Sequence, residues 1–110
     1  MKKKEAKFMR LFVMFDLPTN TKKDRKYATK FRNYLIKLGF MMLQYSIYMR
    51  VCKGDDNANK YSKKIKTNLP PKGNVRLLQI TEKQYERMEI LVGKENFQEK
   101  NISYRQLSLF

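Results

Sequence analysis

Hydrophobic positions follow distinct patterns along the first third of the chain, and each pattern predicts one element. The apolar run RLFVMFD, residues 10–16, is bounded by a nearby proline and is too short for a typical helix, so it predicts a buried strand that ends at Asp16. Apolar residues then recur three and four positions apart over residues 27–38, which predicts an amphipathic helix. An imperfect capping box at Thr21 marks the start of this helix, and Gly39 marks its end.

The pattern becomes alternating within residues 40–51, FMMLQYSIYMRV, from Leu43 onward. Alternation predicts either one bent strand or two short ones, because successive side chains of a strand point to opposite faces. One face would be polar and would carry Gln44, Ser46, Tyr48 and Arg50. Such a face can be solvated, bind single-stranded RNA by stacking, or dock a second copy of the chain.

A second helix and further strands are predicted in the remaining sequence. Apolar residues are spaced for a helix from Ala58 to Leu69, where two prolines end the pattern, and Asp55 or Asp56 is available as its N-cap. The segments NVRLLQIT, RMEILV and NISYRQLSLF read as strands. This order predicts an α+β fold of the split βαβ type, with two helices on one face of a mostly antiparallel sheet.

The domain boundaries follow from the same pattern. Residues 1–8 are expected to form a flexible basic extension, residues 9–93 one domain, and residues 94–110 a C-terminal dimerisation segment. The last strand has no evident place in its own sheet, and adding it to the exposed edge of a second copy would satisfy both backbones. We therefore expect a homodimer.

Composition narrows the classes of partner and of chemistry. The chain has 110 residues, with 25 Lys and Arg against 10 Asp and Glu, a net charge of +15 that favours nucleic acid. It contains no histidine and one cysteine, which excludes zinc sites of the His/Cys type and Ser-His or Cys-His catalysis within the chain. No apolar run is long enough to cross a bilayer and no secretory segment is evident, so we expect a cytoplasmic protein without membrane contact.

Asp16 is the first candidate for chemistry, and three roles are open for it. It can cap the following turn, bind a metal ion, or take part in catalysis. One carboxylate is a poor Mg²⁺ site, because this ion takes six oxygen ligands and commonly uses one or two carboxylates. In a twofold dimer, two copies of Asp16 can share one ion that activates water for phosphodiester hydrolysis.

The first helix and one aromatic residue are candidates for nucleic-acid contact. Basic side chains occupy nearly all of the predicted exposed surface of the helix, which favours binding of phosphate backbones over simple solvation. The residues are Lys22, Lys23, Arg25, Lys26, Lys30 and Arg32. Tyr48, on the polar face of its strand, is the best candidate for base stacking or for packing across a dimer interface.

Three stretches together resemble a known family. LFVMFDLPTNTKKDRKYATKFRNYLIKLGF, MLQYSIYMRV and GNVRLLQITEKQYERMEIL are similar, in this order, to the small CRISPR-associated protein two, one of the two core proteins of CRISPR spacer acquisition. The likeness spans about residues 9–93. It implies a ferredoxin-like homodimer whose C-terminal strand pairs with the other subunit.

The resemblance also implies two activities. One is a scaffold that binds duplex prespacer DNA and bridges subunits of the larger CRISPR integrase. The other is a Mg²⁺-dependent endonuclease acting on RNA or DNA, with Asp16 as the metal ligand. Arg25, Ser46 and Tyr48 match supporting residues of the family, and Met42 stands where a basic residue is often found. The resemblance thus implies that Ser46 and Tyr48 are catalytic together with Asp16. An RNA-binding regulator that uses the open sheet face is the alternative.

Overall fold

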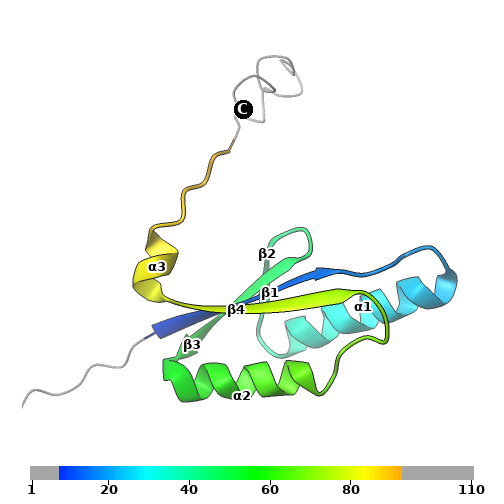
Figure 1. Cartoon of the computed structure of the whole chain (residues 1–110), viewed down its shortest axis with the longest axis horizontal. Helices are drawn as coiled ribbons and strands as arrows, with labels where there is room; N and C mark the ends of the chain where they lie inside the picture. Colours follow the sequence, from blue (N-terminus) through cyan, green and yellow to red (C-terminus); the bar gives the residue numbers. More distant parts are fainter. Residues whose placement is uncertain (1–7, 93–110) are drawn as a thin grey trace, which may run out of the picture.

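A four-stranded antiparallel sheet with its two long helices packed on one face forms the described part of the chain, residues 8–92 of this computed structural model (Figure 1). The strands lie in the order β2-β3-β1-β4. Along the chain the elements are β1 (Phe8–Asp16), α1 (Lys22–Lys37), β2 (Met41–Gln44), β3 (Ile47–Lys53), α2 (Gly54–Lys66), β4 (Asn74–Thr81) and α3 (Glu82–Glu86). The expected α+β fold with βαββαβ order is confirmed. The expected C-terminal strand lies outside the described residues.

β1 is a central strand whose middle residues are buried on both faces, which explains its continuous apolar run. It pairs with β3 on one side and with β4 on the other. Leu11 and Val13 point toward the helices and are 1% and 0% exposed. Phe12 points to the opposite face, where it is still buried against the ring of Tyr85. Asp16, by contrast, ends the strand in the solvent.

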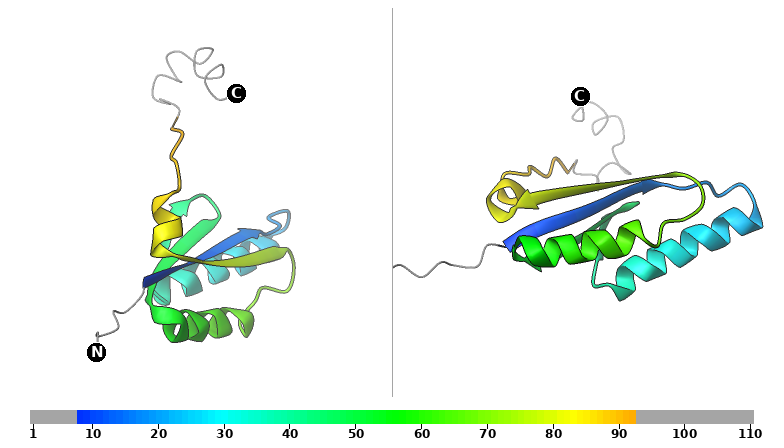
Figure 2. Two further views of the ribbon diagram at one scale, coloured as in Figure 1. Left: turned by 60° about the vertical axis from the view of Figure 1, so that its left-hand side comes forward. Right: turned by 60° about the horizontal axis from the view of Figure 1, so that its bottom comes forward.

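α1 and α2 cover the same face of the sheet, as Figure 2 shows. The capping box predicted for α1 is present: the Asp24 amide donates to Thr21 Oγ1 at 3.0 Å, and the Thr21 amide donates to the Asp24 carboxylate at 3.3 Å. Gly39 follows the helix with φ of +96°, a conformation that glycine adopts without strain. Within residues 8–92, no helix has the length and apolar content that spanning a membrane requires.

The alternating segment forms two short strands, β2 and β3, joined by a turn at Tyr45 and Ser46. The predicted polar face is wrong, because Tyr48 is 3% exposed and faces the helices, where its ring stacks on Phe15 with centroids 5.6 Å apart. Arg50 lies on the same face. Its guanidinium donates to the Leu38 carbonyl and to the Tyr61 hydroxyl, at 2.8 and 3.0 Å.

These two side chains explain the error in the predicted face. Tyrosine and arginine have apolar bodies that can be buried while their polar tips find partners or reach the surface. An alternation of apolar and polar letters therefore does not tell the two faces of β3 apart. Met49, on the opposite face, is also buried, at 2% exposed.

Three smaller expectations also differ from the structure. Neither Asp55 nor Asp56 caps α2; both lie in its first turn, and Lys53 is the N-cap. Leu69 lies beyond the end of α2 and is 52% exposed. The strand predicted at RMEILV is wrong, because residues 88–92 form no strand and find no pairing partner within the described chain.

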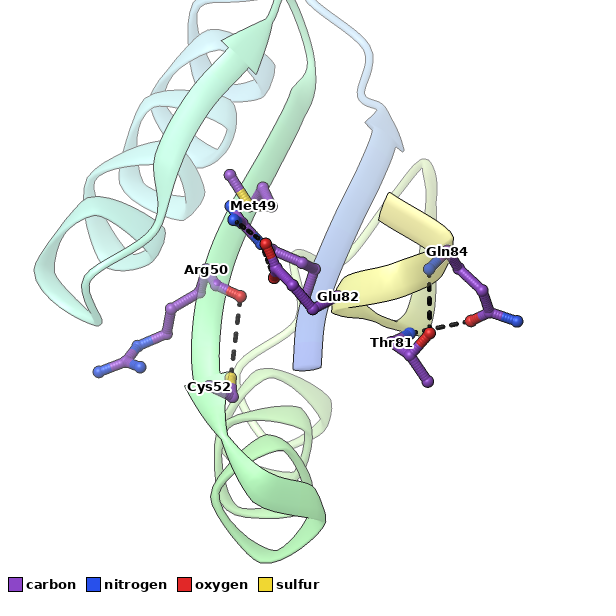
Figure 3. Close-up of polar contacts among 7 residues, drawn as sticks. Met49, Arg50, Cys52, Thr81, Glu82 and Gln84 are labelled. Atoms are coloured by element: carbon purple, nitrogen blue, oxygen red, sulfur yellow. Dashed lines mark hydrogen bonds and ion pairs between the residues drawn. The ribbon is translucent and has the colours of Figure 1, made fainter. Parts of the chain in front are cut away.

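α3 is held against the open face of the sheet by polar contacts from Arg10 on β1. Thr81 and Gln84 form its capping box, drawn in Figure 3. The Arg10 guanidinium donates to Met49 Sδ at 3.3 Å. The Arg10 guanidinium donates to both carboxylate oxygens of Glu82, at 2.7 and 2.8 Å, and lies 3.9 Å from the centre of the Tyr85 ring. The chain is thereby fixed at the point where it leaves β4.

Candidate phosphodiester site and basic helix surface

Asp16 lies at the end of β1, on the face of the sheet that α1 and α2 do not cover. Its neighbour Phe15 points into the core, so the alternation of the strand directs Asp16 to the other side. In the sheet register Asp16 lies directly opposite Asn74, the first residue of β4. A carboxylate at this position is exposed to solvent yet anchored on a central strand.

Asp16 belongs to a surface hollow built from three segments. The end of β1 supplies Met14, Phe15 and Asp16; the turn before β3 supplies Tyr45 and Ser46, with Ile47; and β4 supplies Asn74 and Arg76. The turn is held against β1 by a hydrogen bond from the Phe15 amide to the Ser46 carbonyl at 3.1 Å. Ser46 has φ of +65°, in the left-handed region. The backbone therefore fixes this turn beside the carboxylate.

Gly73 is the closest backbone neighbour of Asp16 from the α2–β4 loop. Its φ is +98°, and a Cβ added there would lie 2.7 Å from the Asp16 carbonyl oxygen and 2.7 Å from Leu17 Cδ2. Only glycine permits this approach, because real Cβ atoms do not come so close to other heavy atoms. Gly73 thus lets the start of β4 lie directly against the end of β1.

The oxygen donors around Asp16 fit a hard cation that keeps much of its water. Asp16, Ser46 and Asn74, which carry a carboxylate, a hydroxyl and an amide, line the same hollow. Within residues 8–92, no group of three or more His, Cys, Asp or Glu side chains is placed to hold a metal ion. One chain therefore contributes a single carboxylate with neutral oxygens, a set that suits Mg²⁺ with several bound waters.

The structure separates the three residues predicted to be catalytic. Ser46 lines the hollow together with Asp16. Tyr48 does not line it, because its ring is buried behind the hollow against Phe15. The exposed aromatic residue at this place is Tyr45, which is 80% exposed.

Sequence reasoning missed three residues of the hollow: Tyr45, Asn74 and Arg76. The two on β4 join Asp16 only through the strand register, which no local pattern reveals. Alternation along residues 40–51 places Tyr45 on the face opposite Ser46 and Tyr48, that is, the apolar one. In the structure the segment is broken into β2 and β3, and Tyr45 lies in the two-residue turn between them.

α1 presents the predicted basic side chains on its outer surface. Lys22, Arg25, Lys26 and Lys30 border one shallow depression, and Lys23 is exposed beside them. Arg25 also donates to the Thr19 carbonyl at 3.0 Å, which steadies the turn after Asp16. Arg32 is half-buried and donates to Thr29.

The acidic residue of α1 does not neutralise this surface. Asp24 is buried, accepts the capping hydrogen bond from Thr21, and faces Lys72 at 3.7 Å. The exposed surface of α1 is therefore lined by cations. This is the distribution of charge that favours binding of phosphate backbones.

Shifted pKa values occur away from the hollow. The hydrogen bond from Arg10 lowers the pKa of Glu82, and the same bond raises the pKa of Arg10. Burial raises the pKa of the Cys52 thiol. Cys52 is therefore protonated at neutral pH and is unsuited to act as a nucleophile.

Comparison with known proteins identifies the family of this chain. The family described as "CRISPR associated protein Cas2" matches residues 9–88. A protein from Campylobacter jejuni named "CRISPR-associated endoribonuclease Cas2" is 55% identical, over 96% of this chain and 74% of the relative. Proteins of the same name from Acidovorax ebreus and Flavobacterium psychrophilum are 45% and 44% identical, over 93% and 91% of this chain and 100% and 86% of the relatives. The chain belongs to the Cas2 family of CRISPR-associated proteins.

Proposed function

We propose that this chain acts in CRISPR adaptation as a basic homodimer that binds duplex prespacer DNA and bridges subunits of the larger CRISPR integrase. The observation that supports DNA binding is the exposed cationic surface of α1, whose acidic residue is turned inward. Such a surface binds phosphates by displacing counterions and needs no base-specific contact. The fold of the sheet supplies a separate face for dimerisation.

The open face of the sheet supports the dimer. A row of apolar side chains crosses all four strands in register: Met41, Met49, Phe12 and Leu78. The two inner residues of this row are buried, whereas Met41 and Leu78, at its ends, are 59% and 47% exposed. Val51 beside the row is 41% exposed. A second copy placed on this face would remove apolar surface from water.

The alternative of an RNA-binding module on the open sheet face has less support. The residue expected to stack on a base, Tyr48, faces the helices and is buried. The open face is apolar in its centre, and α3 contacts both β1 and β4. These features suit protein contact better than contact with RNA.

Salt dependence tests the DNA-binding proposal. The affinity for a short DNA duplex should fall linearly with salt on a logarithmic scale, with a slope of about 0.9 per phosphate contact. Replacing Lys22, Lys26 and Lys30 by glutamine should reduce this slope by up to about 2.7, if each lysine contacts one phosphate. Fluorescence anisotropy at several salt concentrations measures both quantities.

A matched triple variant on α2 serves as the control. Lys60, Lys63 and Lys64 are exposed, and replacing them by glutamine removes the same charge from the other helix. The α2 variant should lose less affinity and keep most of the slope. Equal losses for the two triple variants would show that net charge alone drives binding, and salt-insensitive binding would overturn the proposal. Co-purification of both variants with the integrase tests the bridging role.

We propose in addition that Asp16 supports Mg²⁺-dependent cleavage of phosphodiesters, with RNA as the first substrate to test because the relatives are named endoribonucleases. Asp16 lies on the same face as the apolar row, since it follows Phe12 and Met14 at intervals of two along β1. A twofold dimer formed through this face would bring the two hollows together if its axis passed near the end of β1. Two copies of Asp16, with Ser46 and Asn74, would then hold one ion.

A bound magnesium ion would supply a more acidic water and a positive charge for the reacting phosphate. The chain's own contribution is to fix the oxygen ligands on strand ends and on a turn held by the Phe15 amide. Ser46 can also donate its hydroxyl proton to an oxygen of the substrate. Each of these groups is placed by backbone pairing rather than by a mobile loop.

Substitution of the carboxylate tests the nuclease proposal. Asp16→Asn should abolish cleavage of labelled RNA in Mg²⁺ while leaving dimer mass and duplex affinity unchanged. Asp56→Asn, which removes an exposed carboxylate from α2, is the control and should cleave as wild type does. Cleavage that persists in Asp16→Asn would assign the activity to another site or to a contaminant.

A further inference from the structure

Arg76 lies on the same face of the sheet as Asp16, one diagonal position away. The register pairs Asp16 with Asn74 and Met14 with Arg76, and directly paired residues point to the same face. Diagonal neighbours in an antiparallel pair have Cα atoms about 7–8 Å apart, a span that long side chains bridge. Arg76 and Asp16 also line the same hollow. A cation and a carboxylate therefore border one solvent-open site.

The guanidinium of Arg76 is not used by the fold. Arg10, Arg25 and Arg50 each donate at least one side-chain hydrogen bond to a protein oxygen. Within residues 8–92, Arg76 donates none and forms no ion pair, even with Asp16. An arginine carries five N–H donors in a planar fork. Those of Arg76 are free for a ligand.

A phosphodiester is the ligand that this arrangement suits. Asp16 by itself repels a phosphate, and a divalent cation would offset that repulsion only on the side that it occupies. Arg76 adds a permanent positive charge to the same hollow, and its fork matches two oxygens of one phosphate. The exposed ring of Tyr45 at the rim offers a surface on which a neighbouring base can stack.

We propose that Arg76 is the phosphate-binding residue of the Asp16 site, holding the reacting phosphodiester beside the carboxylate. The proposal rests on the proposed nuclease function for the identity of the site. It adds a residue from β4 that contacts substrate directly. Arg76 is thus expected to affect both the binding of a single nucleic-acid strand and its cleavage.

Binding is measured first, without cleavage. The probe is a fluorescein-labelled eight-nucleotide 2′-O-methyl RNA, titrated in Mg²⁺ against full-length protein at several salt concentrations, and a denaturing gel verifies that the probe stays intact. Arg76→Gln should weaken binding by roughly tenfold, the effect of one hydrogen-bonded charge pair. It should also reduce the salt slope by about 0.7, the contribution of one contact to a single strand. Arg76→Lys should restore the slope but not the full affinity, because lysine keeps the charge and loses the fork.

Arg87→Gln is the matched control. Arg87 is an exposed arginine at the end of α3, away from the hollow, and its replacement removes the same charge. This variant should bind the probe as wild type does. If Arg76→Gln and Arg87→Gln bind alike, the proposal is overturned.

Cleavage and assembly separate the remaining outcomes. In a protein that cleaves RNA, Arg76→Gln should lower the cleavage rate while Arg87→Gln leaves it unchanged. If the wild type does not cleave but Arg76→Gln still weakens binding selectively, the nuclease proposal fails and the phosphate-binding role of Arg76 stands. If Arg76→Gln dissociates the dimer or unfolds, and Arg76→Lys binds with full wild-type affinity, the side chain is structural and the proposal is overturned.

Discussion

Replacing Gly73 by alanine perturbs the backbone that holds Asp16 while leaving every functional side chain in place. The added methyl group would lie 2.7 Å from the Asp16 carbonyl oxygen. Alanine must also adopt φ near +98°, which side chains disfavour. The substitution therefore combines a conformational cost with a steric one, and both act at the junction of β1 and β4.

The size of the effect follows from these two costs. A left-handed conformation costs a non-glycine residue about 1–2 kcal/mol. Inserting a methyl group where there is no room costs typically about 1–3 kcal/mol, and the carbonyl that it meets belongs to a central strand that cannot shift cheaply. We therefore expect Gly73→Ala to lower the free energy of unfolding by about 2–5 kcal/mol.

Gly54→Ala separates the two costs. Gly54 has φ of +86°, but a Cβ added there meets no atom within 4 Å. In this variant the free energy of unfolding should fall only by the conformational cost, about 1–2 kcal/mol. Urea denaturation of both variants and wild type, at one protein concentration, gives the free energies. Equal destabilisation of the two variants would refute the claim that Gly73 is required by its contact with Asp16.

Three further predictions concern residues outside that junction. The hydrogen bond from Arg10 lowers the pKa of Glu82, so the pair stabilises the fold above the pKa of an unfolded glutamate and loses that effect as pH falls through the lower folded value. Glu82→Gln should therefore weaken the pH dependence of the free energy of unfolding, measured by urea denaturation between about pH 3 and pH 7. Arg50→Met leaves the Leu38 carbonyl without its donor and should cost about 1–3 kcal/mol in the same assay. Tyr48→Ala should lower the free energy of unfolding by about 3–5 kcal/mol, because it leaves a cavity in the core. A Tyr48→Phe variant that folds but no longer cleaves RNA would show that the hydroxyl is catalytic.

The strands and helices that have strong local signals were predictable from sequence. The continuous apolar run identified β1 because a central strand is covered on both faces. The capping box at Thr21 and the glycine at residue 39 bounded α1 because both act through neighbouring residues. Asp16 was a candidate for the same reason, since its place at a strand end is visible locally.

Local sequence signals did not predict which face of β3 is turned toward the helices or which residues surround Asp16. Tyr48 and Arg50 are polar residues in the sequence, but both lie on the helix-covered face of β3. Their apolar parts pack inside the fold, and the guanidinium of Arg50 donates to the Leu38 carbonyl. Arg76 is 60 positions from Asp16 in the chain and reaches the hollow only through the pairing of β1 with β4. Long-range register depends on the packing of the whole sheet, which short sequence patterns do not encode.

The antiparallel pairing of β1 with β4 has a practical consequence for labelling. Met9 pairs with Thr81 at one end of these strands, and Asp16 pairs with Asn74 at the other. The chain therefore enters and leaves the sheet at the same end. Seven residue steps along β1, from Met9 to Asp16, separate that end from the hollow by about 23 Å at the usual rise per residue. A fluorophore placed at Phe8 or in α3 would start far from Asp16. Distance measurements from such labels could follow how nucleic acid approaches without occupying the hollow.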